Sequence, residues 1–337
     1  MRILIVSDSW HPQVNAVVRT FEALSSELAW LGHDVLVAGP EISHSLPCPG
    51  EPSIRLAVRP GRALRMLLNS FKPDTLHIAT EGPLGWAARR LCIEEGRPFT
   101  TSYHTRFPEY VLARLGLPLM ASRTFLKRFH APSAAVLAAT PTLKAELEAA
   151  GYERVVLWGR GVDAGQFFPR RLRLPDDPRP ISLYAGRVTA EKGVEDFLRL
   201  DLPGAKWVAG DGPDLPRLEA RHPDVRFWAT QRPQDLARLY SAADVFVFPS
   251  RTDTYGLVLL EALACGLPVA AYPVPGPIDV VTDPKVGVLD EDLGRAARAA
   301  LGLSRAACRK FALKHTWRAS AERFLKIIRQ SEVPTPA

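Results

Sequence analysis

The feature that most constrains this chain is an alternation of short, continuous apolar runs with longer stretches of helical periodicity. The apolar runs are RILIVSD, HDVLVAG, TLHIAT, PFTTSYH, AAVLAAT and RVVLWG in the first half, and ISLYAGR, AKWVAG, VRFWA, DVFVFPS and LPVAAYP in the second. Continuous apolar character predicts parallel strands that are buried on both faces. Because helical patterns such as 17–31 and 143–150 lie between the runs, we expect a doubly wound α/β sheet in each half.

A segment rich in Pro, Arg and Gly, GRGVDAGQFFPRRLRLPDDPRP, separates the two halves. The chain of 337 residues is long enough for two domains, each with its own core. We therefore expect an N-terminal Rossmann-like domain at 1–163, a linker at 164–180, a C-terminal Rossmann-like domain at 181–315, a final helix at 316–330 and a frayed tail at 331–337. The apolar face of the final helix packs either on its own domain or back across the domains.

Composition and charge restrict the classes of function. The chain carries 43 Lys and Arg against 36 Asp and Glu, a net charge of +7. Such a balance fits an anionic small ligand, an anionic membrane surface or nucleic acid. The first run turns polar after six residues, which is too short for a signal peptide. Four scattered cysteines form no metal-type pair, so we expect reduced thiols and a cytoplasmic protein.

Two cations follow the strand ISLYA in the run GRVTAEKG. Gly186 and Arg187 come directly after the strand, and Lys192 lies five positions further on. Arginine offers a fork of hydrogen-bond donors and lysine a point charge, so together they suit a diphosphate. A helix that follows the loop adds an N-terminus, which favours anions. The alternative is a pair of solvated loop cations.

Two carboxylates occur in SRTDTYGLVLLEALACGLPV, after the strand DVFVF. Asp253 precedes a helix that we expect to begin at Gly256 and Leu257, and Glu261 lies within its apolar sequence. Burial of a lone carboxylate is costly without a partner. Along a helix, eight positions span about 12 Å, a separation that suits a ligand with a sugar at one end and a ribose at the other. The alternative for Glu261 is a nearby cation or exposure to solvent.

These two motifs together closely resemble the retaining GT-B glycosyltransferases of family 4, also called glycosyl transferases group 1. The resemblance extends over nearly the whole chain and includes SDSWHPQVNAVVRT, YHTRFPEY, RGVDAGQFFP, GDGPDL and PVPGPIDVV. Within the family, the sequence looks most like bacterial GDP-mannose-dependent α-mannosyltransferases and UDP-sugar:diacylglycerol glycosyltransferases. It implies a GT-B fold, in which two doubly wound Rossmann-like domains face an interdomain cleft.

The resemblance also implies roles for individual residues. The positions that match Arg187 and Lys192 hold the diphosphate and stabilise the leaving group, Asp253 contacts the donor sugar, and Glu261 binds the ribose. The donor site extends over Gly186, Arg187, Lys192, Asp253, Thr254, Tyr255, Gly256, Leu257 and Glu261. His104 polarises or positions the transferred sugar, and Asn15, Ala16 and His104 form the acceptor side. The mechanism implied is front-face retention, without a carboxylate nucleophile or a cofactor.

Two positions depart from the family pattern. Asp253 stands where the wider family usually has Glu, and one methylene fewer shortens its reach by roughly 1.3–1.5 Å. Ala16 stands where many relatives have glycine, whose absence removes a close backbone approach to a ligand. The sequence leaves open whether the donor is GDP-mannose or a UDP-hexose, and whether the acceptor is a lipid or a glycan.

No metal is expected in this site. The D-x-D triplet Asp290-Glu291-Asp292 precedes LGRAARAALGL and is typical of an acidic helix N-terminus, which the helix dipole favours. We therefore predict that the enzyme is metal-independent.

Two basic stretches in the first half fit contact with anionic lipid at the inner face of the cell membrane, or alternatively a solvated surface. One, at 54–72, contains Arg55, Arg59, Arg62, Arg65 and Lys72; the other, at 106–128, contains Arg106, Arg114, Arg123, Lys127 and Arg128 against the single acid Glu109. Leu64, Met66, Leu67, Leu68, Phe107, Tyr110, Leu115 and Leu117 lie among these residues.

Three other functions have some support in the sequence. A nucleotide-sugar epimerase or hydrolase would have a similar two-domain fold. A nicotinamide-dependent oxidoreductase is disfavoured, because the first strand is followed by SWHPQVNAVVR, which lacks the G-x-G-x-x-G turn. A nucleic-acid binder is disfavoured as well, because no known module appears and the carboxylates have no role in one.

Overall fold

The computed structural model describes residues 1–13, 15–48, 51–104, 119–170, 177–229, 231–253 and 255–331. It divides the chain into two compact units, one formed by Met1–Gly159 with the residues from Ser320 onward, and the other by Arg160–Ala319. The division thus falls between Gly159 and Arg160 rather than after residue 163. The predicted linker at 164–180 lies in unit 2, and its residues 171–176 are outside the described part.

Unit 1 contains a six-stranded parallel sheet in the order β2-β1-β5-β6-β7-β8. Its strands are β1 (Arg2–Val6), β2 (Asp34–Ala38), β5 (Thr75–Ile78), β6 (Thr100–Tyr103), β7 (Ala135–Ala138) and β8 (Val155–Leu157). Each strand coincides with one of the predicted apolar runs. Helices between them are α1 (Ala16–Trp30), η1 (Pro40–Ile42), α2 (Gly61–Phe71), α3 (Pro83–Glu94), α5 (Leu119–His130) and α6 (Pro141–Ala149).

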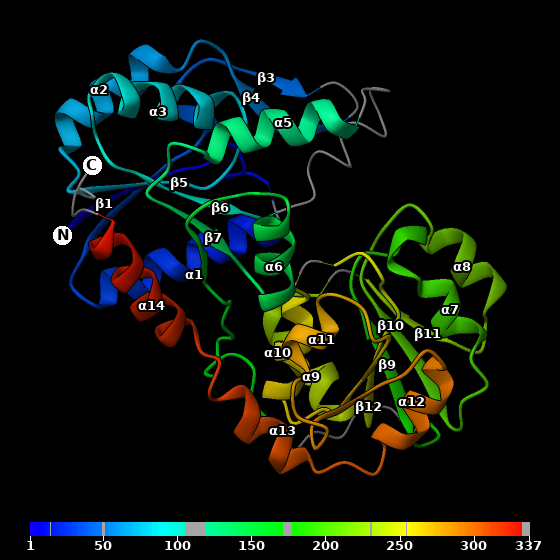
Figure 1. The fold of residues 1–337 in the computed structure, drawn as a ribbon. Helices are drawn as coiled ribbons and strands as arrows, with labels where there is room; N and C mark the ends of the chain where they lie inside the picture. Colours follow the sequence, from blue (N-terminus) through cyan, green and yellow to red (C-terminus); the bar gives the residue numbers. More distant parts are fainter. Residues whose placement is uncertain are drawn as a thin grey trace. The chain divides into compact units, whose positions relative to one another are not determined.

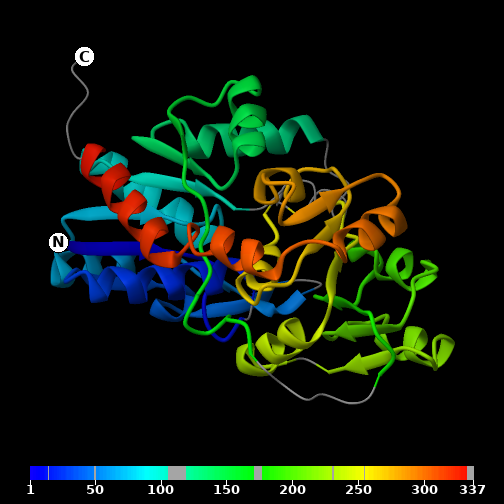
Figure 2. The same cartoon turned by 90° about the horizontal axis from the view of Figure 1, so that it is seen from below.

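The sheet of unit 1 is covered on both faces. Figure 1 shows α2, α3 and α5 along one face, and α1 with α14 (Trp317–Gln330) along the other. Apolar side chains of α14, among them Phe324 and Ile328, join the same core as Ile3 of β1 and Phe21 of α1. The red helix α14 also lies beside the blue N-terminal segment in Figure 2. From Ser320 onward, the final helix therefore belongs to the first unit.

Unit 2 repeats the architecture with a second six-stranded parallel sheet, in the order β11-β10-β9-β12-β13-β14. Its strands are β9 (Ile181–Ala185), β10 (Ala205–Ala209), β11 (Arg226–Trp228), β12 (Val245–Phe248), β13 (Val269–Ala271) and β14 (Gly287–Leu289). Its helices are η2 (Ala190–Lys192), α7 (Val194–Arg199), α8 (Leu215–Arg221), α9 (Pro233–Ala242), α10 (Leu257–Ala264), α11 (Pro277–Val280), α12 (Leu293–Ala300) and α13 (Arg305–Ala312).

The sequence did not predict three strands. β14 begins at Gly287, a residue type that is depleted in strands, and only Val288 and Leu289 follow before the acidic triplet. The antiparallel hairpin of β3 (Ser45–Cys48) and β4 (Glu51–Ala57) was missed because Pro47 lies within β3, and proline argues against a strand except at an edge. Among the described residues, this hairpin is a separate two-stranded sheet, so each of its strands has one edge that pairs with no other described strand.

Candidate active site

The order of strands in unit 2 fixes where a ligand can bind. The chain places β10 and β11 on one side of β9 and β12 to β14 on the other, so the direction of winding reverses between β9 and β12. In such sheets, ligands bind beyond the carboxyl ends of the strands at this reversal. The loops that leave β9 and β12 carry Arg187 and Lys192 on one side and Asp253 on the other. The two predicted motifs therefore meet at the expected place.

Lys192 and Asp253 form an ion pair across these two loops. The Nζ atom of Lys192 donates to Oδ1 of Asp253 at 2.7 Å, and the side chains are 23% and 24% exposed. Arg187 is exposed nearby in the chain, directly after Gly186. The sequence prediction gave Lys192 and Asp253 separate roles, and the structure shows that the two side chains also bind one another.

The helix that suits an anion best here is α10 rather than α7. The first turn of α7 already contains two acids, Glu195 and Asp196, and Glu195 pairs with Arg199 and Arg217. No acid occupies the first turn of α10, whose N-cap is Gly256 and whose first residue is Leu257. Because the N-terminus of a helix favours anions, the start of α10 suits a negatively charged ligand.

Glu261 is buried in α10, only 4% exposed, so exposure to solvent is excluded for this carboxylate. Its Oε2 atom accepts a long hydrogen bond of 3.4 Å from the hydroxyl of Tyr240 on α9. Because α10 begins at Leu257, only the second half of the interval from Asp253 to Glu261 is helical. The estimate of about 12 Å along a helix therefore does not apply to this pair.

Tyr255 lies in the loop before α10, and its hydroxyl is 3.3 Å from the carbonyl of Arg160. Thr254, another residue of the predicted donor site, is outside the described residues.

Three residues that the sequence analysis did not single out shape these loops. The hydroxyl of Tyr184 donates to the carbonyl of Arg187 at 2.6 Å; burial, and then the charge of Asp253, raises the pKa of this tyrosine, so it remains a donor. Gly193 has a φ of +67°, and a Cβ there would lie 2.7 Å from the carbonyl oxygen of Pro249. Gly276 has a φ of +96°, and its Cβ would lie 2.7 Å from the carbonyl oxygen of Asp253. The G-P turn signal at Gly276 was the only sequence hint of this close packing.

On unit 1, Asn15 and Ala16 lie where the chain leaves β1 and enters α1. The Oδ1 atom of Asn15 accepts from the amides of Val17 and Val18, at 3.0 and 3.1 Å, so Asn15 is the N-cap of α1. Its amide nitrogen donates to Ser9 at 2.8 Å. The side chain of Asn15 thus has a structural role in the loop. Ala16 is exposed in the first position of the helix, which has no acid in its first turn.

His104 directly follows β6 and is half-buried among aromatic rings of unit 1. Its ring centroid lies 5.1 Å from that of Phe21 in α1 and 6.3 Å from that of Trp158, which follows β8. Trp158 in turn contacts Phe324 of α14 at 5.2 Å and donates its Nε1 hydrogen to the carbonyl of Ser320. The final helix therefore contacts Trp158, one of the aromatic residues against which His104 packs.

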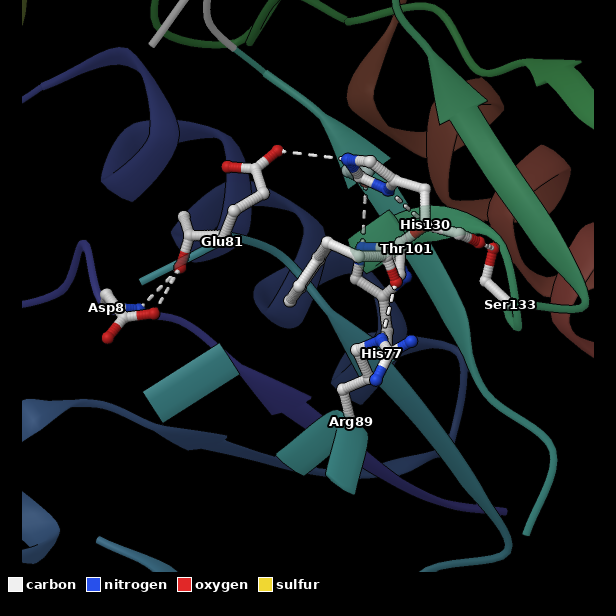
Figure 3. Close-up of polar contacts among 10 residues, drawn as sticks. Asp8, His77, Glu81, Arg89, Thr101, His130 and Ser133 are labelled. Carbon is white, nitrogen blue, oxygen red and sulfur yellow. Dashed lines mark hydrogen bonds and ion pairs between the residues drawn. The ribbon is translucent and has the colours of Figure 1, made fainter. Parts of the chain in front are cut away.

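Two further carboxylates, Asp8 and Glu81, lie at the ends of β1 and β5 (Figure 3). The Asp8 carboxylate accepts hydrogen bonds from the amides of Leu84 and Gly85, at 2.7 and 3.1 Å, and so caps the N-terminus of α3. Burial raises the pKa of Asp8 despite these hydrogen bonds. Sequence reasoning missed both residues, because neither lies in a pattern that is specific by itself.

The acidic triplet at 290–292 forms the predicted helix N-terminus. Asp292 accepts from the amide of Arg295 at the start of α12, Asp290 pairs with the Arg295 side chain, and Glu291 lies 3.4 Å from Arg251. Within the described part of the chain, no three His, Cys, Asp or Glu side chains are grouped as metal ligands would be. Metal independence remains a prediction.

Comparisons with known proteins place this geometry in a family. Residues 17–166 match Glycosyltransferase Family 4, and residues 179–305 match Glycosyl transferases group 1. A GDP-mannose-dependent alpha-mannosyltransferase of Mycobacterium tuberculosis is 32% identical over 86% of this chain and 83% of its own length. The chain belongs to the family 4 glycosyltransferases.

Other relatives of this glycosyltransferase agree with that assignment. Alpha-monoglucosyldiacylglycerol synthase of Streptococcus pneumoniae is 27% identical over 89% of this chain and 78% of its own length. Among solved structures, sucrose-phosphate synthase from Thermosynechococcus elongatus superposes with a TM-score of 0.78 at 21% identity, covering 98% of each chain. The fold is therefore GT-B, with two Rossmann-like domains.

The contact between Gly193 and Pro249 leads to a first prediction. Gly193→Ala adds a collision with a carbonyl oxygen to the strain of a positive φ, so it should displace Lys192. Gly96→Ala is the matched control, because Gly96 has a φ of +62° and open space around its Cβ position. We expect Gly96→Ala to lose about 1–2 kcal/mol of unfolding free energy in urea titrations, and Gly193→Ala to lose more because of the added collision. Only Gly193→Ala should also bind GDP or UDP at least about tenfold more weakly in calorimetry. Wild-type nucleotide affinity in folded Gly193→Ala would contradict this role.

Proposed function

We propose that this enzyme transfers a hexosyl unit, with retention of configuration, from GDP-mannose or a UDP-hexose to a lipid or glycan acceptor. The observation that carries the proposal is the Lys192–Asp253 pair at the strand reversal of unit 2, beside a helix N-terminus without acids. A nucleotide-sugar presents a diphosphate to the cation and sugar hydroxyls to the carboxylate.

The names of the relatives support this choice of substrates. Mannosyltransferases that depend on GDP-mannose occur among them in Mycobacterium tuberculosis and Mycolicibacterium smegmatis. The pneumococcal relative is named for a glucosyl-diacylglycerol product. The names of the mannosyltransferases include GDP-mannose, a donor with a diphosphate, and the name of the pneumococcal relative favours a lipid acceptor.

In the proposed reaction, charge develops on the diphosphate as the bond to the sugar breaks. Arg187 and Lys192 stabilise that charge, and the start of α10 adds its dipole. Asp253 binds hydroxyls of the transferred sugar, while Glu261 binds the ribose. His104 polarises or orients the sugar, and the acceptor is bound by unit 1, with Asn15 and Ala16 nearby. The acceptor attacks the face from which the diphosphate leaves, and the departing phosphate oxygen takes its proton.

Nucleotide release in the presence and absence of acceptor tests the reaction class. GDP-mannose, UDP-glucose, UDP-galactose and UDP-glucuronate are each incubated with the enzyme, with and without diacylglycerol vesicles and soluble glycans. A transferase releases nucleotide only when an acceptor is added. Release without acceptor would indicate a hydrolase, and conversion of the sugar without nucleotide release would indicate an epimerase. Thermal shift identifies the donor first, because a ligand at 100 times its dissociation constant stabilises by about 2.7 kcal/mol.

A second prediction concerns Lys192. Lys192→Ala removes a charged hydrogen bond to the diphosphate, of about 1.5–3 kcal/mol, and leaves Asp253 without its cation beside a negative ligand. We expect kcat/KM to fall roughly 10- to 100-fold or more, with the unfolding transition preserved. Lys285→Ala, at an exposed lysine of the same unit, serves as the control and should retain activity. Near-normal turnover by folded Lys192→Ala would refute the assignment.

We further propose that unit 1 docks on anionic lipid through the surface formed by α2, α3 and α5. Exposed apolar and basic residues occur on all three helices: Arg62, Arg65 and Met66 on α2, Arg90 and Ile93 on α3, and Phe125 and Arg128 on α5. Arg65 and Arg90 share Glu94, and Arg89 donates to the carbonyl of Arg128, so the helices are neighbours. The first part of the second basic stretch, 106–118 with Arg106 and Arg114, lies outside the described residues. No described helix is long and apolar enough to cross a membrane.

The third prediction follows from this surface. Removal of three basic residues in Arg62→Ser/Arg65→Ser/Arg90→Ser should weaken co-sedimentation with phosphatidylserine vesicles at low salt, by about 1 kcal/mol per residue. The matched control is Arg323→Ser/Lys326→Ser/Arg329→Ser, which removes three exposed basic residues from α14 on the other face of the sheet. Binding should also fall as salt is added. Equal binding of the two triple variants would contradict docking through α2, α3 and α5.

A further inference from the structure

The strand that leads to His104 is unusually polar for the centre of a sheet. Thr100, Thr101 and Ser102 of β6 are all buried, and β6 lies between β5 and β7 in unit 1. Buried hydroxyls are nearly always hydrogen-bonded, because an unmet one costs about 1–3 kcal/mol. The partners of these hydroxyls therefore determine how firmly β6, and the residue that follows it, is held.

One face of β6 is held by a histidine of the neighbouring strand. The imidazole of His77, in β5, bonds Thr100 Oγ1 through Nδ1 at 2.8 Å and Ser102 Oγ through Nε2 at 2.9 Å. Side chains alternate along a strand, so His104 follows on this face. Phe21 contacts both imidazoles, with ring centroids 5.6 Å from His77 and 5.1 Å from His104.

The other face of β6 is held by a second histidine, at the end of α5. Nδ1 of His130 bonds Thr101 Oγ1 at 2.8 Å, and the Thr101 hydroxyl lies 3.3 Å from that of Ser133. The Ser133 hydroxyl donates to the carbonyl of His130 at 2.7 Å, which closes a ring of contacts (Figure 3). The ring of Tyr103, the residue before His104, lies 5.8 Å from the His130 ring.

The remaining nitrogen of His130 points at a carboxylate. Nε2 of His130 lies 3.3 Å from Oε1 of Glu81, and the two residues are only 1% and 8% exposed (Figure 3). The approach is too poorly directed for a regular hydrogen bond, and neither atom has another such partner among the described residues. Either group would be costly to bury as an isolated charge. The burial of these two side chains is therefore best explained by their facing one another.

We propose that Glu81 and His130 act as a positioning pair for His104. The pair fixes the carboxyl end of β6 through the hydrogen bond to Thr101 and the ring contact with Tyr103. Neither residue contacts the reacting atoms in this proposal. The inference rests on the proposed function, since it assigns His104 to the transfer step.

Other titratable groups face the pair from the surrounding elements. Asp8, after β1, and Tyr152, after α6, both interact electrostatically with Glu81, and Arg123 of α5 interacts with Tyr152. Burial, reinforced by Glu81, raises the pKa of Tyr152 to about 12, so its phenol stays neutral near pH 7. Tyr103 faces the His130 ring from β6.

The fourth prediction compares Glu81→Gln with Ser133→Ala. Glu81→Gln keeps the shape of the side chain but removes its charge, whereas Ser133→Ala removes a buried hydrogen bond of the same cluster and leaves Glu81 and His130 facing each other. For Glu81→Gln we expect kcat to fall about tenfold or more, the donor KM to stay within about twofold, and the pH dependence of kcat to change. Ser133→Ala should lower the melting temperature but keep the wild-type pH profile.

Proton NMR supplies a readout that does not require turnover. The titration of the His104 imidazole, identified by its loss in His104→Gln, should shift in Glu81→Gln and not in Ser133→Ala. If Glu81→Gln does not fold, Glu81→Asp and His130→Gln replace it in both measurements. A pH profile and a His104 titration that match the wild type would overturn the proposal. A wild-type enzyme that transfers no sugar would instead refute the proposed function, and the NMR titration would still decide the role of the pair.

Discussion

The parallel pairing of β9 with β12 is the constraint on which the proposed donor site depends. Val245 pairs with Ser182 and Phe246 with Leu183, although more than 60 residues separate the strands in sequence. Because both strands run in the same direction, their following loops leave the same edge of the sheet. Lys192 and Asp253 meet there, and Gly276 packs under the carbonyl of Asp253 from a third loop. The chemistry of the site is thus a consequence of strand order.

Lys192 pairs with Asp253 in the structure, and another anion is able to replace Asp253 as the partner of this lysine. Pairs at such exposure contribute up to about 1 kcal/mol, whereas a charged hydrogen bond to a phosphate contributes about 1.5–3 kcal/mol. We propose that a diphosphate takes Lys192 from Asp253 and that the released carboxylate then binds sugar hydroxyls. In this proposal, binding of the donor diphosphate to Lys192 is also the step that frees the Asp253 carboxylate for the sugar.

The sequence predicted most of this architecture, and the exceptions have physical reasons. The eleven predicted strands exist because continuous apolar runs have few alternatives to burial in a sheet. The positions of Arg187 and Lys192 after β9 followed from the same pattern. The Glu81–His130 pair could not be predicted, since it depends on how α5 packs against β6. The assignment of α14 to unit 1 also required the tertiary structure, because its apolar face fits either unit by periodicity alone.

The most direct test of the account is the affinity of the sugar-free nucleotides for Asp253→Asn. Calorimetry with GDP and UDP measures this affinity in the wild type and the variant. If Asp253 competes with the diphosphate for Lys192, the preferred nucleotide should bind up to about fivefold more tightly to the variant, while sugar transfer falls. Unchanged or weaker binding of both nucleotides to folded Asp253→Asn would contradict the claim that Lys192 exchanges its carboxylate for the donor diphosphate.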